Sequence, residues 1–217
     1  MKEFLFFNLF LNENIVYNED IQEKGENMKK IVDMMHDFIL TYLHEDSIAV
    51  DFTLGQGNDL MFFANQYKIA HVYGFDIQKE AIAICEEKVA AAQKQEKVTF
   101  ILDGHQHCKQ YIKAFDIGMF NFGYLPQGDP TITTLLETSK VAVEEALSML
   151  RKKGILVLVV YPGHDAGKEE SKYFDTWCKT LSAHEFNVLY VRLSNHLHAP
   201  YGIIIERIKN KKIEEKE

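Results

Sequence analysis

The chain has 217 residues, of which 47% are hydrophobic and 12% aromatic, enough for one domain with a sizeable core. Its net charge of −8 argues against broad nucleic-acid binding, because neutralising phosphates requires clustered Lys and Arg. The three cysteines lie far apart without a C-x-x-C pair, so neither a zinc site nor a disulfide framework is indicated and a reducing cytoplasmic setting is expected.

The first 27 residues differ from the rest of the chain. Lys2 and the apolar run after it resemble a secretory signal, but no small-residue cleavage site follows and Asn8 interrupts the run. Residues 18–27 are polar and typical of a linker, and helical spacing of apolar residues begins after Met28. We expect a peripheral extension over 1–27, one domain over 28–210 and a charged tail over 211–217.

From Ser47 onward, short β-rich runs alternate with helical ones. Strands are expected at 47–52, 70–76, 97–102, 115–121, 154–161, 186–193 and 201–208, and helices at 58–68, 78–93, 105–113, 131–151 and 167–182. Continuous apolar runs such as 155–160 are typical of strands covered by helices on both faces. The sequence therefore predicts a doubly wound α/β fold with a seven-stranded, mostly parallel sheet. The loop 194–200 is too short for a parallel crossover, so the last two strands should pair antiparallel.

The first strand runs into a glycine-rich loop, "DFTLGQGNDL", over residues 51–60. Gly55 and Gly57 permit a tight turn and let backbone N–H groups approach a ligand, and Asn58 or Asp59 can cap the helix that follows. A dinucleotide-binding fingerprint fits poorly, because its third glycine is replaced by Leu60, and the lysine of a P-loop is absent.

Acidic residues follow the next two expected strands. Asp76 can accept hydrogen bonds from both hydroxyls of a ribose, and Asp103 with His105 can read the edge of an adenine base. Together with the glycine loop, this order indicates a Rossmann-like class I methyltransferase that binds S-adenosylmethionine. Each residue also has a structural reading: Asp51 as a buried hydrogen-bonding group, Asp76 as a helix cap and Asp103 as a turn former.

The segment "NFGYLPQGDP", residues 121–130, follows the fourth strand, where such methyltransferases place residues that orient the acceptor. Asn121 offers an oxygen that can orient an amine lone pair, and Tyr124 can stack on a flat substrate. The alternative is a hydrogen-bonded turn with Tyr124 packed on the core. Candidate proton acceptors are Asp129, Tyr161 and His164, of which His164 is equally compatible with a loop histidine bonded to backbone. Asn195, His196 and His198 are expected to border the same pocket.

At these residues the chain resembles a known family. The segments "DFTLGQGNDLMFFA", "YGFDIQKEAI", "FNFGYLPQGDPTITT", "VYPGHDAGKEE" and "NHLHAPYGIIIE" are similar to those of the family called putative rRNA methylases, some members of which are tRNA 5-aminomethyl-2-thiouridine methyltransferases. The resemblance implies an S-adenosylmethionine site that includes Gln56 and Gln78, and an enzyme that completes 5-methylaminomethyl-2-thiouridine at the wobble position. Gln56 departs from the usual Asn and adds a methylene to that contact.

The expected site is then as follows. Catalytic candidates are Asn121, Tyr124, Asp129 and His164, and cofactor candidates are Asp51, Thr53, Gly55, Gln56, Gly57, Asp59, Asp76, Gln78, Asp103 and His105; no metal, metal motif or membrane contact is expected. The expected partner is the anticodon region of tRNA, and ribosomal RNA or a small molecule is the alternative methyl acceptor. A homodimer is a possible oligomeric state. An NAD-dependent oxidoreductase and a non-catalytic nucleotide-binding module are the competing interpretations.

Overall fold

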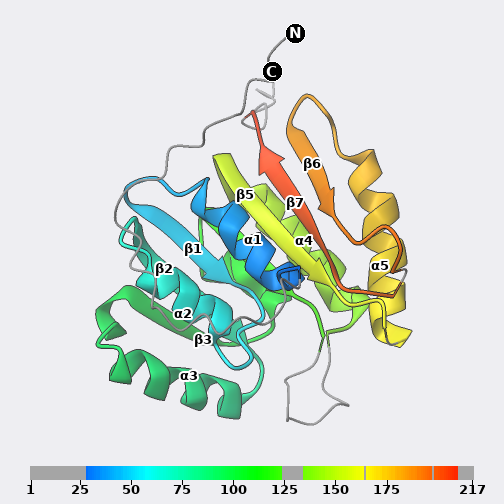
Figure 1. Cartoon of the computed structure of the whole chain (residues 1–217). Helices are drawn as coiled ribbons and strands as arrows, with labels where there is room; N and C mark the ends of the chain where they lie inside the picture. The colour runs from blue at the N-terminus through cyan, green and yellow to red at the C-terminus, as the bar shows by residue number, and fades with distance from the viewer. Residues whose placement is uncertain (1–27, 124–133, 164, 197, 210–217) are drawn as a thin grey trace, which may run out of the picture.

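A seven-stranded sheet with helices on both faces forms the protein in the computed structural model, which describes residues 28–209 except 124–133, 164 and 197 (Figure 1). The strands are β1 (Ser47–Asp51), β2 (Ile69–Asp76), β3 (Val98–Leu102), β4 (Phe115–Asn121), β5 (Leu150–Val160), β6 (Phe186–Val191) and β7 (Tyr201–Arg207). The helices are α1 (Ile31–Leu40), α2 (Asn58–Asn65), α3 (Lys79–Ala91), α4 (Leu136–Met149) and α5 (Asp165–Trp177). The proposed extension 1–27, the tail 211–217, Tyr124, Asp129 and His164 lie outside the described residues.

The strand order is β3-β2-β1-β4-β5-β7-β6, and the first five strands of the chain run parallel. β7 lies between β5 and β6 and is antiparallel to both. This confirms the predicted α/β sheet and its antiparallel end. Because the strand order reverses between β1 and β4, the carboxyl ends of these two strands border a crevice at that end of the sheet.

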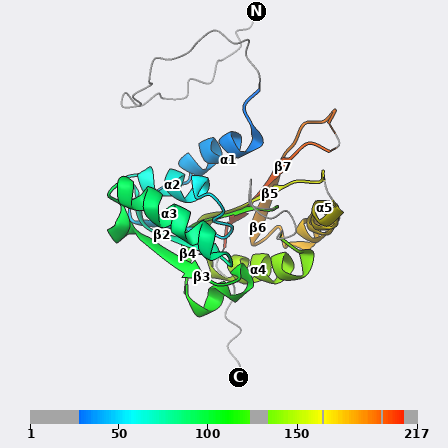
Figure 2. The same cartoon turned by 90° about the horizontal axis from the view of Figure 1, so that it is seen from below.

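The apolar run of β5 shows why both faces of the sheet are covered. Ile155, Val157 and Val159 belong to one buried cluster, which includes Met35 of α1 and Leu60 of α2. The alternate residues Leu156, Leu158 and Val160 belong to the other cluster, which contains buried side chains of α4 and α5. Figure 2 shows α1, α2 and α3 on one side of the sheet and α4 on the other. The continuous apolar pattern of a doubly wound strand is therefore borne out.

Several expected elements differ from the structure; the helix expected at 167–182, for instance, is α5, which ends at Trp177. The helix expected at 131–151 is α4, which ends at Met149, because Leu150 already pairs with Phe115 and opens β5. The register shifts after Phe115, and Lys153 takes a positive φ of 69°, so the basic stretch 151–154 is an irregular start of β5. The helix expected at 105–113 is a 3₁₀ helix over His105–Gln110, held by bonds between residues three apart, such as His107 N to Gly104 O.

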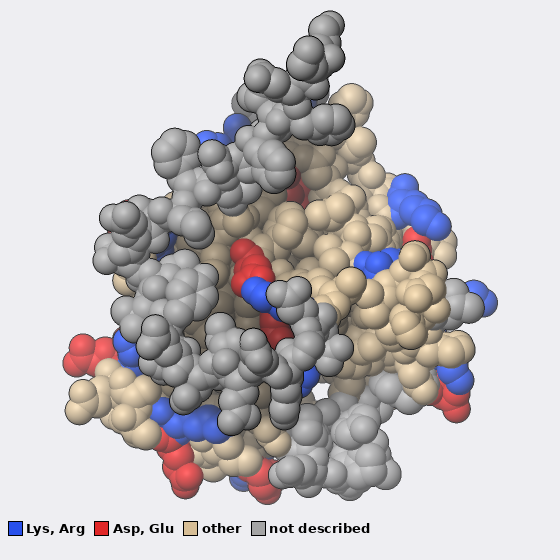
Figure 3. Space-filling model, in the orientation of Figure 1, with Lys and Arg blue, Asp and Glu red and all other residues tan. Residues whose placement is uncertain are grey.

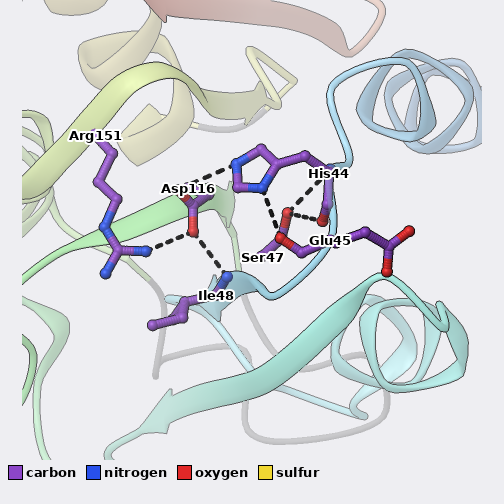
Figure 4. A network of polar contacts seen from close by, with 6 residues as sticks. All are labelled: His44, Glu45, Ser47, Ile48, Asp116 and Arg151. Carbon is purple, nitrogen blue, oxygen red and sulfur yellow. Dashed lines mark hydrogen bonds and ion pairs between the residues drawn. The ribbon is translucent and has the colours of Figure 1, made fainter.

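A buried carboxylate connects the starts of three strands at the end of the sheet opposite that crevice (Figure 4). Asp116 Oδ2 accepts hydrogen bonds from the backbone N–H of Ile48 at 2.9 Å and from Arg151 Nη1 at 2.8 Å. Asp116 Oδ1 lies 3.4 Å from His44 Nε2. The side chain thus connects β4 to the starts of β1 and β5, and its role is structural.

Candidate active site

A cavity of about 930 Å³ opens at the carboxyl ends of the parallel strands. One side is lined by the loops after β1, β2 and β3, through residues 52–56, 58–59, 75–78 and 103–106. The other side is lined by residues 121–123 after β4, by 134, 135 and 138 before and within α4, and by 161, 163, 198 and 200. The lining includes three carboxylates, those of Asp59, Asp76 and Asp103, and among the described residues it includes neither Lys nor Arg. The cavity therefore favours cationic groups over anionic ones.

The glycine loop after β1 owes its shape to two left-handed residues. Gly55 and Gly57 have φ values of 49° and 74°, a region that other residues rarely adopt. A Cβ on Gly57 would also lie 2.5 Å from Cys85 Sγ of α3. Only glycine fits there, and it lets the backbone of Gly55 and Gln56 form the cavity wall.

Asp76, at the end of β2, holds this loop in place. Its Oδ2 accepts the backbone N–H of Gly55 at 2.9 Å, and its Oδ1 accepts that of Gln78 at 2.9 Å. Each carboxylate oxygen has a further lone pair, so the side chain can still accept bonds from vicinal hydroxyls. The residue is both a loop anchor and a suitable ribose acceptor.

Asp51 lies behind the cavity wall and does not line it. The side chain is fully buried, its Oδ1 accepts the backbone N–H of Thr53 at 3.1 Å, and its Oδ2 has no hydrogen-bond partner among the described residues. Burial, together with the negative charges of Asp59 and Asp76, raises its pKa well above the ordinary carboxyl value. The arrangement matches the structural reading of Asp51. Gly57, likewise, shapes the loop from outside the cavity lining.

At the end of β3, Asp103 and His105 both line the cavity, but their surroundings differ. Asp103 accepts hydrogen bonds from His107 Nδ1 at 2.9 Å and from the Tyr111 hydroxyl at 2.7 Å, and these bonds lower its pKa. His105 Nδ1 donates to the Phe52 carbonyl at 3.1 Å, and burial lowers its pKa to about 4. Because a carbonyl only accepts, the proton of the neutral His105 ring lies on Nδ1 and Nε2 is an acceptor.

A polar network surrounds Asn121 at the end of β4. Its backbone N–H donates to Thr53 Oγ1 at 2.7 Å, and its amide Nδ2 donates to Asp59 Oδ2 at 3.2 Å. His36 Nε2 of α1 lies 2.7 Å from Asp59 Oδ1. Burial and the charge of Asp59 raise the pKa of Tyr161, which a hydrogen bond with Asn121 partly offsets. His36 was not among the predicted site residues, because its only signal in the sequence is a histidine beside the apolar stripe of a helix.

The ends of the segment after β4 are bonded to each other. Gly123 N–H donates to Thr134 Oγ1 at 2.9 Å, and Thr134 N–H donates to the Gly123 carbonyl at 2.9 Å. Thr134 Oγ1 and Ser139 Oγ both donate to the buried carboxylate of Glu170, at 3.2 and 2.6 Å. The pair of Gly123 and Thr134 thus joins the residues on either side of 124–133. Beyond it, His198 and Pro200 line the cavity, whereas Asn195 and His196 do not.

S-adenosylmethionine fits these residues by chemistry. A carboxylate on β2 suits ribose hydroxyls, the neutral acceptor Nε2 of His105 suits an exocyclic amine, and a lining with three carboxylates suits a positively charged sulfonium. Among the described residues, no group of three His, Cys, Asp or Glu side chains is placed to hold a metal ion. None of the helices in the described part of the chain has the length and apolar character to cross a membrane.

Comparisons with known proteins give one consistent family. The family model described as "Putative rRNA methylase" matches residues 72–207. The chloroplastic tRNA (mnm(5)s(2)U34)-methyltransferase of Arabidopsis thaliana is 26% identical over 194 residues, covering 84% of this chain and 71% of that protein.

Two solved structures are similar to this chain in both fold and sequence. The crystal structure of a protein named as a putative rRNA methylase from Clostridium thermocellum is 35% identical with a TM-score of 0.79, covering 84% of this chain and 100% of that one. SMU.1697c from Streptococcus mutans, a protein named as a putative methyltransferase and solved in complex with SAH, is 30% identical with a TM-score of 0.75, covering 83% and 99%.

Proposed function

Because the chain belongs to the Putative rRNA methylase family and is an S-adenosylmethionine-dependent methyltransferase, we propose that it methylates an aliphatic amine on RNA. The acceptor we propose is the 5-aminomethyl group of 5-aminomethyl-2-thiouridine at the wobble position of tRNA. The family assignment decides against the NAD-dependent oxidoreductase and the non-catalytic module. The observation that carries the proposal is the Asn121 amide, which lines the cavity at the end of β4.

The residues divide between the two reactants. Asp76, Gln78 and His105 would hold the nucleoside of S-adenosylmethionine, and the loop through Gln56 would surround its amino-acid part. S-adenosylmethionine supplies a methyl group bound to a positively charged sulfur. When the substrate nitrogen forms a bond to the methyl carbon, the C–S bond breaks and its electron pair stays on the sulfur. Asn121 Oδ1 would accept a hydrogen bond from an N–H of the substrate amine and so direct the nitrogen lone pair toward the methyl carbon.

An amine acceptor must lose a proton before it reacts. With lysine as a guide, a pKa of about 10.4 makes deprotonation at pH 7 cost on the order of 4 to 5 kcal/mol. The carboxylates of the lining attract the ammonium form into the cavity, and desolvation there favours the neutral amine that reacts. Tyr161, whose pKa is raised, is protonated at neutral pH and is thus a hydrogen-bonding group rather than the base. Asp129 and His164 remain our proposed proton acceptors.

tRNA is preferred to ribosomal RNA because the Arabidopsis relative is named for tRNA, although the family description names rRNA. On the face drawn in Figure 3, the visible Lys and Arg side chains are scattered among Asp and Glu. RNA contact on this face would therefore use separate basic residues, which agrees with recognition of one exposed nucleotide in the anticodon region. Buried thiols at Cys85, Cys108 and Cys178 support a cytoplasmic location, and a homodimer stays part of the proposal.

The test is mass spectrometry of tRNA nucleosides from cells that lack the protein. We expect 5-methylaminomethyl-2-thiouridine to disappear and its 5-aminomethyl precursor to accumulate, and the purified protein with S-adenosylmethionine should convert that tRNA in vitro. Asn121→Ala should bind S-adenosylmethionine normally yet fail to restore the product, because it removes only acceptor alignment. Unchanged tRNA nucleosides together with a lost ribosomal RNA methylation would overturn the tRNA assignment.

A further inference from the structure

Three hydrogen-bonded side chains connect α1 to the cavity. His36 Nε2 lies 2.7 Å from Asp59 Oδ1, and Asp59 Oδ2 accepts from Asn121 Nδ2 at 3.2 Å. The side chains of His36 and Asp59 are 17% and 6% exposed, so water has little access to the bonds between them. A hydrogen bond to a charged group in such a setting is stronger than one at the surface.

This connection and the hydrogen bond between Asn121 and Tyr161 together orient the Asn121 amide. An ionised carboxylate has only acceptors, so the amide must turn its NH₂ group toward Asp59. Its Oδ1 is then directed away from Asp59 and, with two lone pairs, can accept a hydrogen bond from the substrate even beside Tyr161. If Asp59 lost its fixed position, the amide could rotate and present NH₂ to the substrate, which would repel the hydrogens of an incoming amine.

His36 is well suited to fix Asp59. Its ring stacks on Phe62 with the ring centres 3.9 Å apart and the planes within 3°. The stacking orients the ring, and the ring directs one N–H at one oxygen of Asp59, which leaves the other oxygen for Asn121.

We propose that His36 is a positioning residue for methyl transfer, which acts through Asp59 to keep Asn121 Oδ1 facing the acceptor nitrogen. The inference rests on the proposed nitrogen acceptor. His36 does not line the cavity, and the role proposed for it requires no contact with either reactant.

Two substitutions separate the parts of the histidine. His36→Phe keeps a ring that can stack on Phe62 but removes the donor, whereas His36→Gln keeps an N–H donor and loses the ring. The matched control is His44→Phe, since His44 also lies beside a buried aspartate, Asp116, at the opposite edge of the sheet. For each protein we would measure kcat on tRNA from cells lacking the enzyme, the Kd of S-adenosylmethionine, and the NMR signals of the Asn121 side-chain amide, assigned by their absence in Asn121→Ala.

We expect kcat of His36→Phe to fall roughly ten- to a hundredfold, because small misalignments of a positioning group have effects of that size. The Kd of S-adenosylmethionine should change far less, His36→Gln should recover most of kcat, and His44→Phe should retain kcat. The Asn121 amide signals should shift in His36→Phe and return toward their wild-type positions in His36→Gln.

A normal kcat in His36→Phe, an equal defect in His36→Gln, or a loss of cofactor affinity as large as the loss of kcat would overturn the positioning role. If the wild-type protein methylates no such tRNA, the proposed function fails, and the NMR comparison still decides whether His36 orients the Asn121 amide. Amide signals of Asn121 that do not respond to His36→Phe would then refute it, and signals that shift and recover would support it.

Discussion

Asp76→Ala tests the cofactor side of the site most directly, because this carboxylate has two separable roles. It holds the loop through Gly55 and Gln78, and it is the proposed acceptor for ribose hydroxyls. Hydrogen bonds to a charged group contribute about 1.5 to 3 kcal/mol each, so losing the ribose contact should weaken S-adenosylmethionine binding about ten- to a hundredfold. Gly55 and Gln78 are partly exposed, so water can replace the two hydrogen bonds to their backbone N–H groups. The free energy of unfolding should therefore fall by about 1 to 3 kcal/mol.

Titration calorimetry of the cofactor and urea unfolding of the free protein measure the two effects separately. Asp116→Ala is the matched control, since that carboxylate also accepts a backbone N–H but lies at the opposite edge. We expect the control to lower the free energy of unfolding by a similar amount while leaving the Kd unchanged. An unchanged Kd in Asp76→Ala would show that Asp76 only supports the loop, and a weakened Kd in Asp116→Ala would show that affinity follows stability.

Three further predictions concern ionisable groups around the cavity. The raised pKa of Asp51 means that the folded state binds a proton more tightly than the unfolded state, so stability should fall as pH rises above the ordinary carboxyl value of about 3.9. Asp51→Asn should flatten that decline in urea unfolding from pH 4 to 8, and a slope as steep as that of the wild type would contradict it. Tyr161→Phe should lower methyl transfer but leave the apparent pKa values of the kcat/KM profile in place, whereas loss of one limb would make Tyr161 the base. Glu170→Gln should lower the free energy of unfolding by about 1 to 2 kcal/mol, because the NH₂ group that replaces one carboxylate oxygen cannot accept the bond from the hydroxyl facing it, and an unaltered urea midpoint would refute this.

The parts of the fold that follow from local pattern were predictable. β4 lies at the expected residues 115–121, because a short apolar run followed by glycine and proline residues is typical of a strand buried on both faces. The start of β5 was not predictable, since "LRKK" resembles a helix end and becomes a strand only by pairing with Phe115. Its register depends on a neighbour some thirty-five residues earlier in the chain, and no local propensity carries that information.

The site shows the same division. The order of loops predicted that Asp76, His105 and Asn121 would meet, because parallel strands end at one edge. Burial of Asp51 behind the wall, by contrast, depends on how tightly the loop packs on β1. His36 joins the site only because α1 lies against the same face of the sheet as α2, which is a tertiary relation.

The bonded pair of Gly123 and Thr134 has a consequence for exchanging the segment between them. Gly123 and Thr134 are joined by two hydrogen bonds, and Thr134 also donates to Glu170, so the positions of both residues flanking 124–133 are fixed by the folded domain. Sequence or length changes between them need not alter β4 or α4. We therefore expect a chimera that carries residues 124–133 of another family member to fold and bind cofactor as the parent does.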